Sequence, residues 1–357
     1  YKLDPVTDKT TANDQKHTPR KATLRKKLYL VLFGLLFGLL LCEMMLRLIG
    51  FSYPIFYSTD YYRGVALRPS FEGRYQKEGE SYVRINSDGL RDREHPKPKP
   101  AGTIRIALLG DSYAEALQVP VEQAFWSILE RKLQECEAFP GKRVETINFG
   151  VSGYGTGQEL VTLRNNVWQY SPDIVLLAFT TNNDVSDNSR ALKQTNEIPY
   201  FVYENGELAY DASFRDSSAY QWHDSKLSKL GRWFHDHLRI VQLVHYVQFV
   251  GKLRLTEWRN RRRAATTTPP APAGATTPTA AEIGIDNMIY VEPQDDNWKK
   301  AWRVTEGLIR QMRDEVRQKG GRFIVVTLSN AIQVAPNPAV RQDFMKRIGV
   351  NTVFYPN

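Results

Sequence analysis

The sequence predicts an α/β protein in which helices cover both faces of a parallel sheet. Four apolar segments have the length and composition of buried strands, and segments with apolar residues at helical spacing separate them. Continuous apolar strands are typical of parallel sheets, because both faces of such sheets are covered. Regular alternation of strands with helices indicates the same architecture. The predicted strands span 104–109, 144–149, 174–179 and 323–328.

The predicted helices occupy the intervals between these strands. A helical pattern follows the first strand over 114–133, and its clearest apolar periodicity lies within 121–135. A second helix is predicted over 157–169. A third is predicted over 298–319, where Gly320-Gly321 supplies the usual stop signal.

An apolar segment near the N-terminus predicts one transmembrane helix over 28–50. About 20 apolar residues are enough to cross a bilayer. Basic residues precede the segment, which predicts a disordered cytoplasmic tail over 1–27 and an extracytoplasmic location for the rest of the chain. We therefore expect a single-pass protein of the bacterial inner membrane with its main domain in the periplasm. A cleaved signal peptide is the competing interpretation.

The remainder divides into a connector over 51–102 and a globular domain over 103–357. Within the connector, the Pro/Lys repeat at 96–100 predicts a stiff extended spacer. The domain carries a predicted insertion over 185–297, which contains a long basic amphipathic helix over 227–263 and an Ala/Thr/Pro-rich loop over 264–281. This helix either covers the core or lies against a membrane or a partner protein.

Composition narrows the classes of function. The formal charge is +9, but the basic residues cluster beside the apolar segment and at 259–263, without an aromatic–basic stripe or a nucleic-acid-binding module. We therefore expect no nucleic-acid partner. Cys42 and Cys136 are far apart in the sequence, which argues against a disulfide framework and a structural zinc site. No metal or cofactor is predicted.

Polar turns with small residues follow each of the first three predicted strands. Gly110-Asp111-Ser112 follows the first strand, 148–155 the second and 180–184 the third. Because parallel strands present their carboxyl ends at one sheet edge, these turns should meet there. A serine hydroxyl, glycine N–H groups and an asparagine amide together make a nucleophile with an oxyanion hole. The pattern therefore predicts serine-based acyl transfer.

These turns also carry a family resemblance. The segments IRIALLGDSYAEAL, INFGVSGYGTGQEL and PDIVLLAFTTNNDVSDN resemble the SGNH/GDSL hydrolases, and in particular a membrane-anchored extracytoplasmic subgroup. The resemblance extends from about residue 86 to the end of the chain. It implies a flavodoxin-like three-layer α/β/α sandwich.

The resemblance assigns roles to individual residues. Ser112 is implied as the nucleophile, Gly153 and Asn183 as oxyanion donors, and Asp111 as the residue that supports the serine turn. One position departs from the family pattern, because Asn182 stands where the family usually has glycine. The Asn183 donor remains in place despite this change.

The general base is the larger departure. The family takes its base from a late Asp-x-x-His motif, whereas this sequence has no Asp-x-x-His after residue 95 and its last histidine is His245. We expect that the chain is cut short and that the base lies beyond residue 357. Loss of the base is the alternative. His223 is an internal candidate whose position in the sequence does not exclude it.

The predicted function is a membrane-anchored serine esterase acting on O-acyl groups of a glycan, a lipid or a small ester. An O-acyltransferase for an envelope polysaccharide would use the same site with an alcohol in place of water. A third hypothesis is a non-catalytic accessory subunit of a larger membrane complex. Such a subunit would contact its partner through the transmembrane helix and the basic helix over 227–263.

Overall fold

The computed structural model describes residues 24–181, 183–267, 287–290, 292–293, 295–348 and 351. The chain divides into two compact units, Tyr1–Phe51 and Ser52–Asn357. Residues 1–23 of the tail expected over 1–27, the departure at Asn182 and residues 268–281 of the expected loop lie outside the described residues, whereas residues 24–27 of that tail are helical.

The first unit contains one long apolar helix. Helix α1 spans Leu24–Leu48 and begins four residues before the predicted segment 28–50. Its 25 residues extend about 37 Å, which exceeds the roughly 30 Å hydrocarbon core of a bilayer. Within it, Glu43 and Arg47 form an ion pair of 2.8 Å. The helix suits a membrane span by length and composition, and a signal sequence shares both properties.

The second unit is built on a four-stranded parallel sheet, and all four predicted strands are confirmed. The strands are β5 (Thr103–Gly110), β6 (Arg143–Asn148), β7 (Ile174–Thr180) and β10 (Arg322–Leu328). Their order in the sheet is β10-β7-β5-β6. The chain therefore adds β6 on one side of β5 and then β7 and β10 on the other, as in flavodoxin-like sheets. The direction in which strands are added to the sheet reverses between β5 and β7, and sheets of this type bind ligands at such a point.

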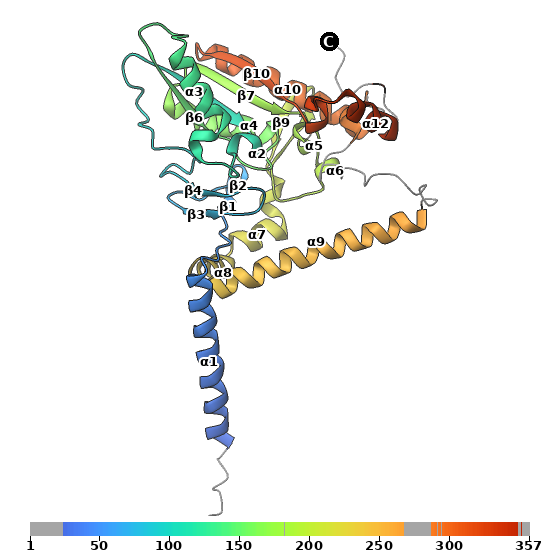
Figure 1. Ribbon diagram of the computed structural model, residues 1–357. Helices are drawn as coiled ribbons and strands as arrows, with labels where there is room; N and C mark the ends of the chain where they lie inside the picture. Colours follow the sequence, from blue (N-terminus) through green and yellow to red (C-terminus); the bar gives the residue numbers. More distant parts are fainter. Residues whose placement is uncertain are drawn as a thin grey trace, which may run out of the picture. The chain divides into compact units, whose positions relative to one another are not determined.

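Helices cover both sheet faces, which confirms the three-layer α/β/α fold. Helix α3 (Phe125–Glu135) packs on one face, and α4 (Thr156–Asn165) and α10 (Asp296–Gln318) lie together against the other (Figure 1). In the sequence, each of these three helices lies between two strands of the sheet and returns the chain to the start of the next parallel strand.

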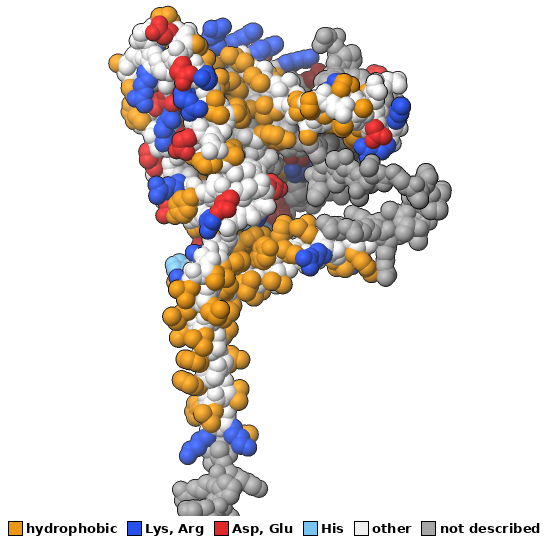
Figure 2. All heavy atoms as spheres, in the orientation of Figure 1, with side chains coloured by type: hydrophobic (Ala, Val, Ile, Leu, Met, Phe, Trp, Pro, Cys, Tyr) orange, Lys and Arg blue, Asp and Glu red, His pale blue; other side chains and the backbone are white. Residues whose placement is uncertain are grey.

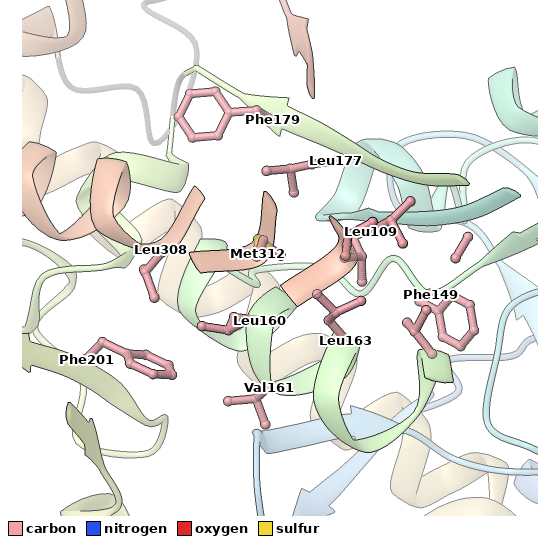
Figure 3. Packing of buried hydrophobic residues seen from close by; sticks show 14 of the residues in the cluster. Leu109, Phe149, Leu160, Val161, Leu163, Leu177, Phe179, Phe201, Leu308 and Met312 are labelled. Carbon is pink, nitrogen blue, oxygen red and sulfur yellow. The ribbon is translucent and has the colours of Figure 1, made fainter. Parts of the chain in front are cut away.

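The core follows from the two-residue period of the strands. On β5, Ala107 and Leu109 face the α4–α10 layer, whereas Ile106 and Leu108 face α3. Figure 3 shows the first of these clusters, with Leu109 beside side chains from α4 and α10. Each fully buried leucine contributes about 2 kcal/mol through removal of apolar surface from water. This packing fixes the strand ends from which the polar turns emerge.

The helix predicted over 114–133 is interrupted. Helix α2 (Ser112–Glu115) ends at Ala116 in a left-handed conformation, and a 3-10 turn η1 (Val121–Gln123) precedes α3. The carbonyl oxygen of Ala114 accepts hydrogen bonds of 3.0 Å from the Trp126 indole and the Asn148 amide. A continuous helix would use that carbonyl for its own ladder, so these tertiary contacts end α2 after one turn.

The basic helix predicted over 227–263 is broken into two helices. Helix α8 spans Lys226–His237. Leu238, whose backbone is extended, separates it from α9 (Arg239–Thr267). The Gln242 side chain donates to the carbonyl oxygen of His235 at 3.0 Å and so satisfies the end of α8. Helix α9 extends four residues into the segment predicted as a loop over 264–281, so residues 264–267 are helical instead.

Short elements fill the connector and the insertion. The connector forms two antiparallel hairpins, β1–β2 and β3–β4, and the insertion adds a third, β8–β9. These elements are β1 (Tyr57–Asp60), β2 (Gly64–Leu67), β3 (Glu72–Tyr75), β4 (Ser81–Arg84), α5 (Asp184–Asp187), α6 (Arg190–Lys193), β8 (Tyr200–Glu204), β9 (Glu207–Asp211), η3 (Ser213–Asp216) and α7 (Ser218–Asp224). The remaining short elements are η2 (Val167–Tyr170), η4 (Asn287–Tyr290), α11 (Ala331–Val334) and α12 (Pro338–Ile348).

The stretch predicted as a stiff extended spacer at 96–100 is hydrogen-bonded to the sheet. Buried Arg105 donates to the carbonyl oxygens of Pro96 at 2.9 Å and Lys97 at 3.0 Å, and to the carboxylate of Glu145 at 2.7 Å. His95, buried beside Glu145 at 2.9 Å, has a raised pKa: burial opposes the charged form, but Asp92 and Glu145 outweigh it. The connector is therefore part of the folded domain.

Candidate active site

The Ser112 turn is shaped by its two neighbours. Asp111 caps α2 and accepts a hydrogen bond of 3.0 Å from the Tyr113 backbone N–H. A Cβ at Gly110 would lie 2.8 Å from the Ala114 side chain, so only glycine allows α2 to start this close to the strand. Ser112 is consequently the first helical residue, with its side chain partly exposed at the helix N-terminus.

Asp111 links this turn to the loop after β7. Its buried carboxylate accepts a hydrogen bond of 3.0 Å from the Thr180 hydroxyl. The pKa of Asp111 is raised because burial disfavours the charged form, although contacts with Tyr113, Thr180 and Asn183 oppose the rise. Asp111 and Asn183, which the sequence places in separate turns, therefore lie together at one sheet edge.

Asn183 is held from its other side. Its side-chain amide donates to the Asp187 carboxylate at 3.2 Å, and Asp187 pairs with Lys193. The pKa of Asp187 is nevertheless raised, since burial outweighs the nearby positive charge. An asparagine amide that donates one N–H to a carboxylate keeps a defined direction and has a second N–H for an oxyanion.

The glycine-rich loop after β6 lies against the serine-bearing helix. A Cβ at Gly150 would approach the Ala114 side chain at 2.5 Å, so the loop packs directly on α2. The Val151 N–H donates to the Gly110 carbonyl oxygen at 3.1 Å. Gly153 is exposed and has φ +77, and a Cβ there would meet nothing within 4 Å. Position 153 therefore favours glycine because its backbone is left-handed, and not because a side chain would collide with a neighbour.

Glu115 is a residue of this site that the sequence reasoning missed. Its side chain is fully buried and accepts hydrogen bonds from the Tyr57 hydroxyl at 2.8 Å and from the Ser152 hydroxyl. Burial raises the pKa of Glu115 to about 7. The carboxyl group joins α2, the Gly153 loop and strand β1 of the connector. The sequence feature that could have pointed to Glu115 is its position three residues after Ser112, at the end of α2.

Two further buried carboxyl groups lie behind the site. Glu159 on α4 and Asp184 on α5 are both fully buried, and their pKa values are raised well above the ordinary range by burial and by repulsion from neighbouring acids, Asp111 among them. Within the described residues neither Glu159 oxygen has a hydrogen-bond partner. Burial and this repulsion therefore disfavour a negative charge on either group beside the nucleophile.

The described histidines are engaged elsewhere. His95 sits in the buried network with Glu145. His223 lies 3.5 Å from the Glu197 carboxylate, and His235 stacks on His245 with ring centroids 4.8 Å apart. His237 contacts the Trp233 carbonyl oxygen. The structure thus brings the predicted nucleophile, supporting aspartate and asparagine together, and it pairs none of these histidines with Ser112.

The chain is similar to known esterases over part of its length. No family model matches it. An arylesterase of Vibrio mimicus is 34% identical over 79 residues, which are 22% of this chain and 38% of the relative. The chain resembles the SGNH/GDSL esterases. The matched part of this chain spans less than half the length of the arylesterase.

Several solved structures are also similar to the chain. The SGNH-hydrolase family esterase AlinE4 is 12% identical, with 70% of this chain and 95% of that chain covered and a TM-score of 0.24. TesA is 21% identical over 23% of this chain and 42% of its own, with a TM-score of 0.20. The lipase Lip_vut3 from a goat rumen metagenome is 22% identical over 26% and 46%, with a TM-score of 0.20.

Proposed function

We propose that this chain is a membrane-anchored extracytoplasmic serine esterase that hydrolyses O-acyl esters. One observation carries the proposal: polar turns from three adjacent parallel strands are bonded to one another around Ser112. Asp111 beside Ser112 accepts from Thr180 and lies next to Asn183. The loop that carries Gly153 packs on the same helix from the other side.

In the proposed mechanism the Ser112 hydroxyl oxygen attacks the acyl carbon of an ester. The carbonyl oxygen gains the negative charge and receives hydrogen bonds from the backbone N–H groups of Ser112 and Gly153 and from the Asn183 amide. The bond between the acyl carbon and the alcohol oxygen then breaks, and the alcohol leaves with a proton. Water attacks the acyl-serine in the second step, which releases the acid and restores Ser112.

The proton of Ser112 requires a general base. The family pattern supplies this base as a histidine of a late Asp-x-x-His motif, and none of the described histidines pairs with Ser112. Burial and mutual repulsion raise the pKa values of Glu159 and Asp184, which disfavours added negative charge from these two groups near the developing oxyanion. The location outside the cytoplasm rests on α1 and the basic residues before it.

Turnover of p-nitrophenyl acetate by the full-length protein tests the proposal. Ser112→Ala should reduce the rate at least about 1,000-fold, since removal of a nucleophile leaves only the oxyanion hole and binding. Ser127→Ala on α3 is the matched control and should retain wild-type turnover. Equal turnover by wild type and Ser112→Ala would refute the esterase and favour the accessory-subunit hypothesis.

A further inference from the structure

A large cavity opens between the Gly153 loop and the helices of the insertion. Its volume is about 1140 Å³, above the roughly 300–1,000 Å³ of typical small-molecule pockets. The wall is mostly apolar on the helical side. We call it the α8 cavity, and among the residues that line it are Ser152, Gly153, Leu227, Leu230, Phe234 and Val241.

Polar and charged side chains also line the cavity, among them Lys193, Glu197, His223 and Arg232. Ser152 and Gly153 belong to the loop that carries the proposed oxyanion donor. His235 also lines the cavity; it is fully buried, and neither ring nitrogen has a hydrogen-bond partner among the described residues. Burial and the neighbouring His245 lower the pKa of His235 to about 4, so its ring is neutral. A cavity that combines apolar side chains of α8 with charged groups elsewhere on its wall suits an amphiphile with one polar end.

The outer surface of α8 and α9 is apolar and basic. Trp233, Val247 and Leu255 have exposed fractions of 52%, 59% and 47%. Figure 2 shows apolar side chains gathered along these helices, with basic groups among them. Soluble monomers rarely expose apolar side chains in such density. Helices that combine Trp and Leu with Lys and Arg bind anionic lipid surfaces.

The chain itself ties this surface to the end of the apolar helix. The Arg239 guanidinium donates to the Ser52 hydroxyl at 3.1 Å, and the Tyr53 N–H donates to the Gln242 side chain at 2.8 Å. Three residues separate Ser52 from Leu48, the last residue of α1. Four residue steps span at most about 14 Å. If α1 crosses the bilayer, the start of α9 is therefore confined near the lipid headgroups.

We propose that the α8 cavity binds the acyl chain of a membrane lipid and that the esterase acts on an acylated lipid taken from the bilayer surface. The chain of the lipid would lie against Leu227, Leu230 and Phe234. Its ester carbonyl would point toward Gly153. The hydrolytic half of this inference rests on the proposed function, whereas binding of the chain does not.

Photocrosslinking tests the binding. The full-length protein is reconstituted into phosphatidylethanolamine–phosphatidylglycerol vesicles that contain a diazirine-bearing palmitate, irradiated, and mapped by mass spectrometry. Label should concentrate on the α8 peptide, and Leu230→Asp should reduce it at least about fivefold, because the new carboxylate makes the wall polar. Leu253→Asp is the matched control: its side chain is similarly exposed, 45% against 51%, but lies outside the cavity lining.

Leu227→Asp provides a second cavity variant in case Leu230→Asp lowers the yield of folded protein. Label spread evenly along α8 and α9, or equally reduced by all three substitutions, would overturn the inference. Hydrolysis of p-nitrophenyl acetate is measured alongside. Ser112-dependent turnover without α8 labelling would refute lipid binding and keep the proposed esterase. Concentrated α8 labelling without Ser112-dependent turnover would refute the esterase and keep the lipid-binding cavity.

Discussion

The Tyr57 hydroxyl donates a hydrogen bond of 2.8 Å to the buried carboxyl group of Glu115. The two residues belong to different parts of the chain, the connector and the helix that begins at Ser112. Because Glu115 also accepts from Ser152, one carboxyl group fixes the spacing between the proposed nucleophile and the loop of Gly153. The connector is thereby a structural part of the candidate active site.

Glu115 gives the protein a pH-dependent stability. Folding raises its pKa from 4.5 to about 7, so the native state holds this proton more tightly than the unfolded chain. The free energy of unfolding should therefore fall as pH rises from 4.5 to 7, by about 3 kcal/mol from this group. Thermal melting at pH 5 and pH 8 should show this loss in wild type and a smaller one in Glu115→Gln. An equal loss in both proteins would contradict the assignment.

Gly153 and Gly206 form a matched pair for testing the oxyanion loop. Both have positive φ, +77 and +88, and both have open space where a Cβ would lie. Substitution by alanine should lower the free energy of unfolding by about 1–2 kcal/mol at either site, because both backbones lie in the left-handed region. Ester hydrolysis should fall at least about tenfold only in Gly153→Ala, where the strain moves a proposed oxyanion donor. Equal rates in the two variants would argue against that role.

Asn183 should affect the rate of hydrolysis rather than substrate binding. Asn183→Ala removes a side-chain donor to the proposed oxyanion and should reduce kcat about 100- to 1,000-fold with little change in KM. Asn165→Ala, at an exposed position near the end of α4, serves as the control and should behave as wild type. A change confined to KM would show instead that Asn183 contacts the substrate in its ground state.

Arg105 should dominate the attachment of the connector. Arg105→Ala removes a fully buried guanidinium and leaves Glu145 with His95 as its remaining partner, which should destabilise the protein by about 3–5 kcal/mol. Arg84→Ala breaks the exposed ion pair with Glu72 and should cost less than about 1 kcal/mol. Denaturant titration of the two variants compares these values, and similar losses would contradict the structural role of Arg105.

The sheet could be predicted from the sequence because its strands are continuous apolar segments between helical ones. The breaks in the helices could not, since they depend on contacts distant in sequence. Trp126 and Asn148 take the carbonyl of Ala114, and Gln242 satisfies the carbonyl of His235. Local apolar periodicity contains no information on these partners.

The candidate site divides in the same way. Ser112, Gly153 and Asn183 follow predicted strands, so the rule that parallel strands end at one edge was enough to group them. Glu115 and Tyr57 were missed because their meeting depends on where the connector packs. The general base stays a prediction, as do the catalytic roles of the three grouped residues.

Covalent trapping of Ser112 tests the central claim most directly. A fluorophosphonate probe reacts with a serine that is activated by a base and faces an oxyanion hole, and mass spectrometry identifies the modified residue. The account predicts stoichiometric labelling of Ser112 in the folded full-length protein and its loss after denaturation. An unlabelled Ser112, or label on a different serine in the folded protein, would contradict it.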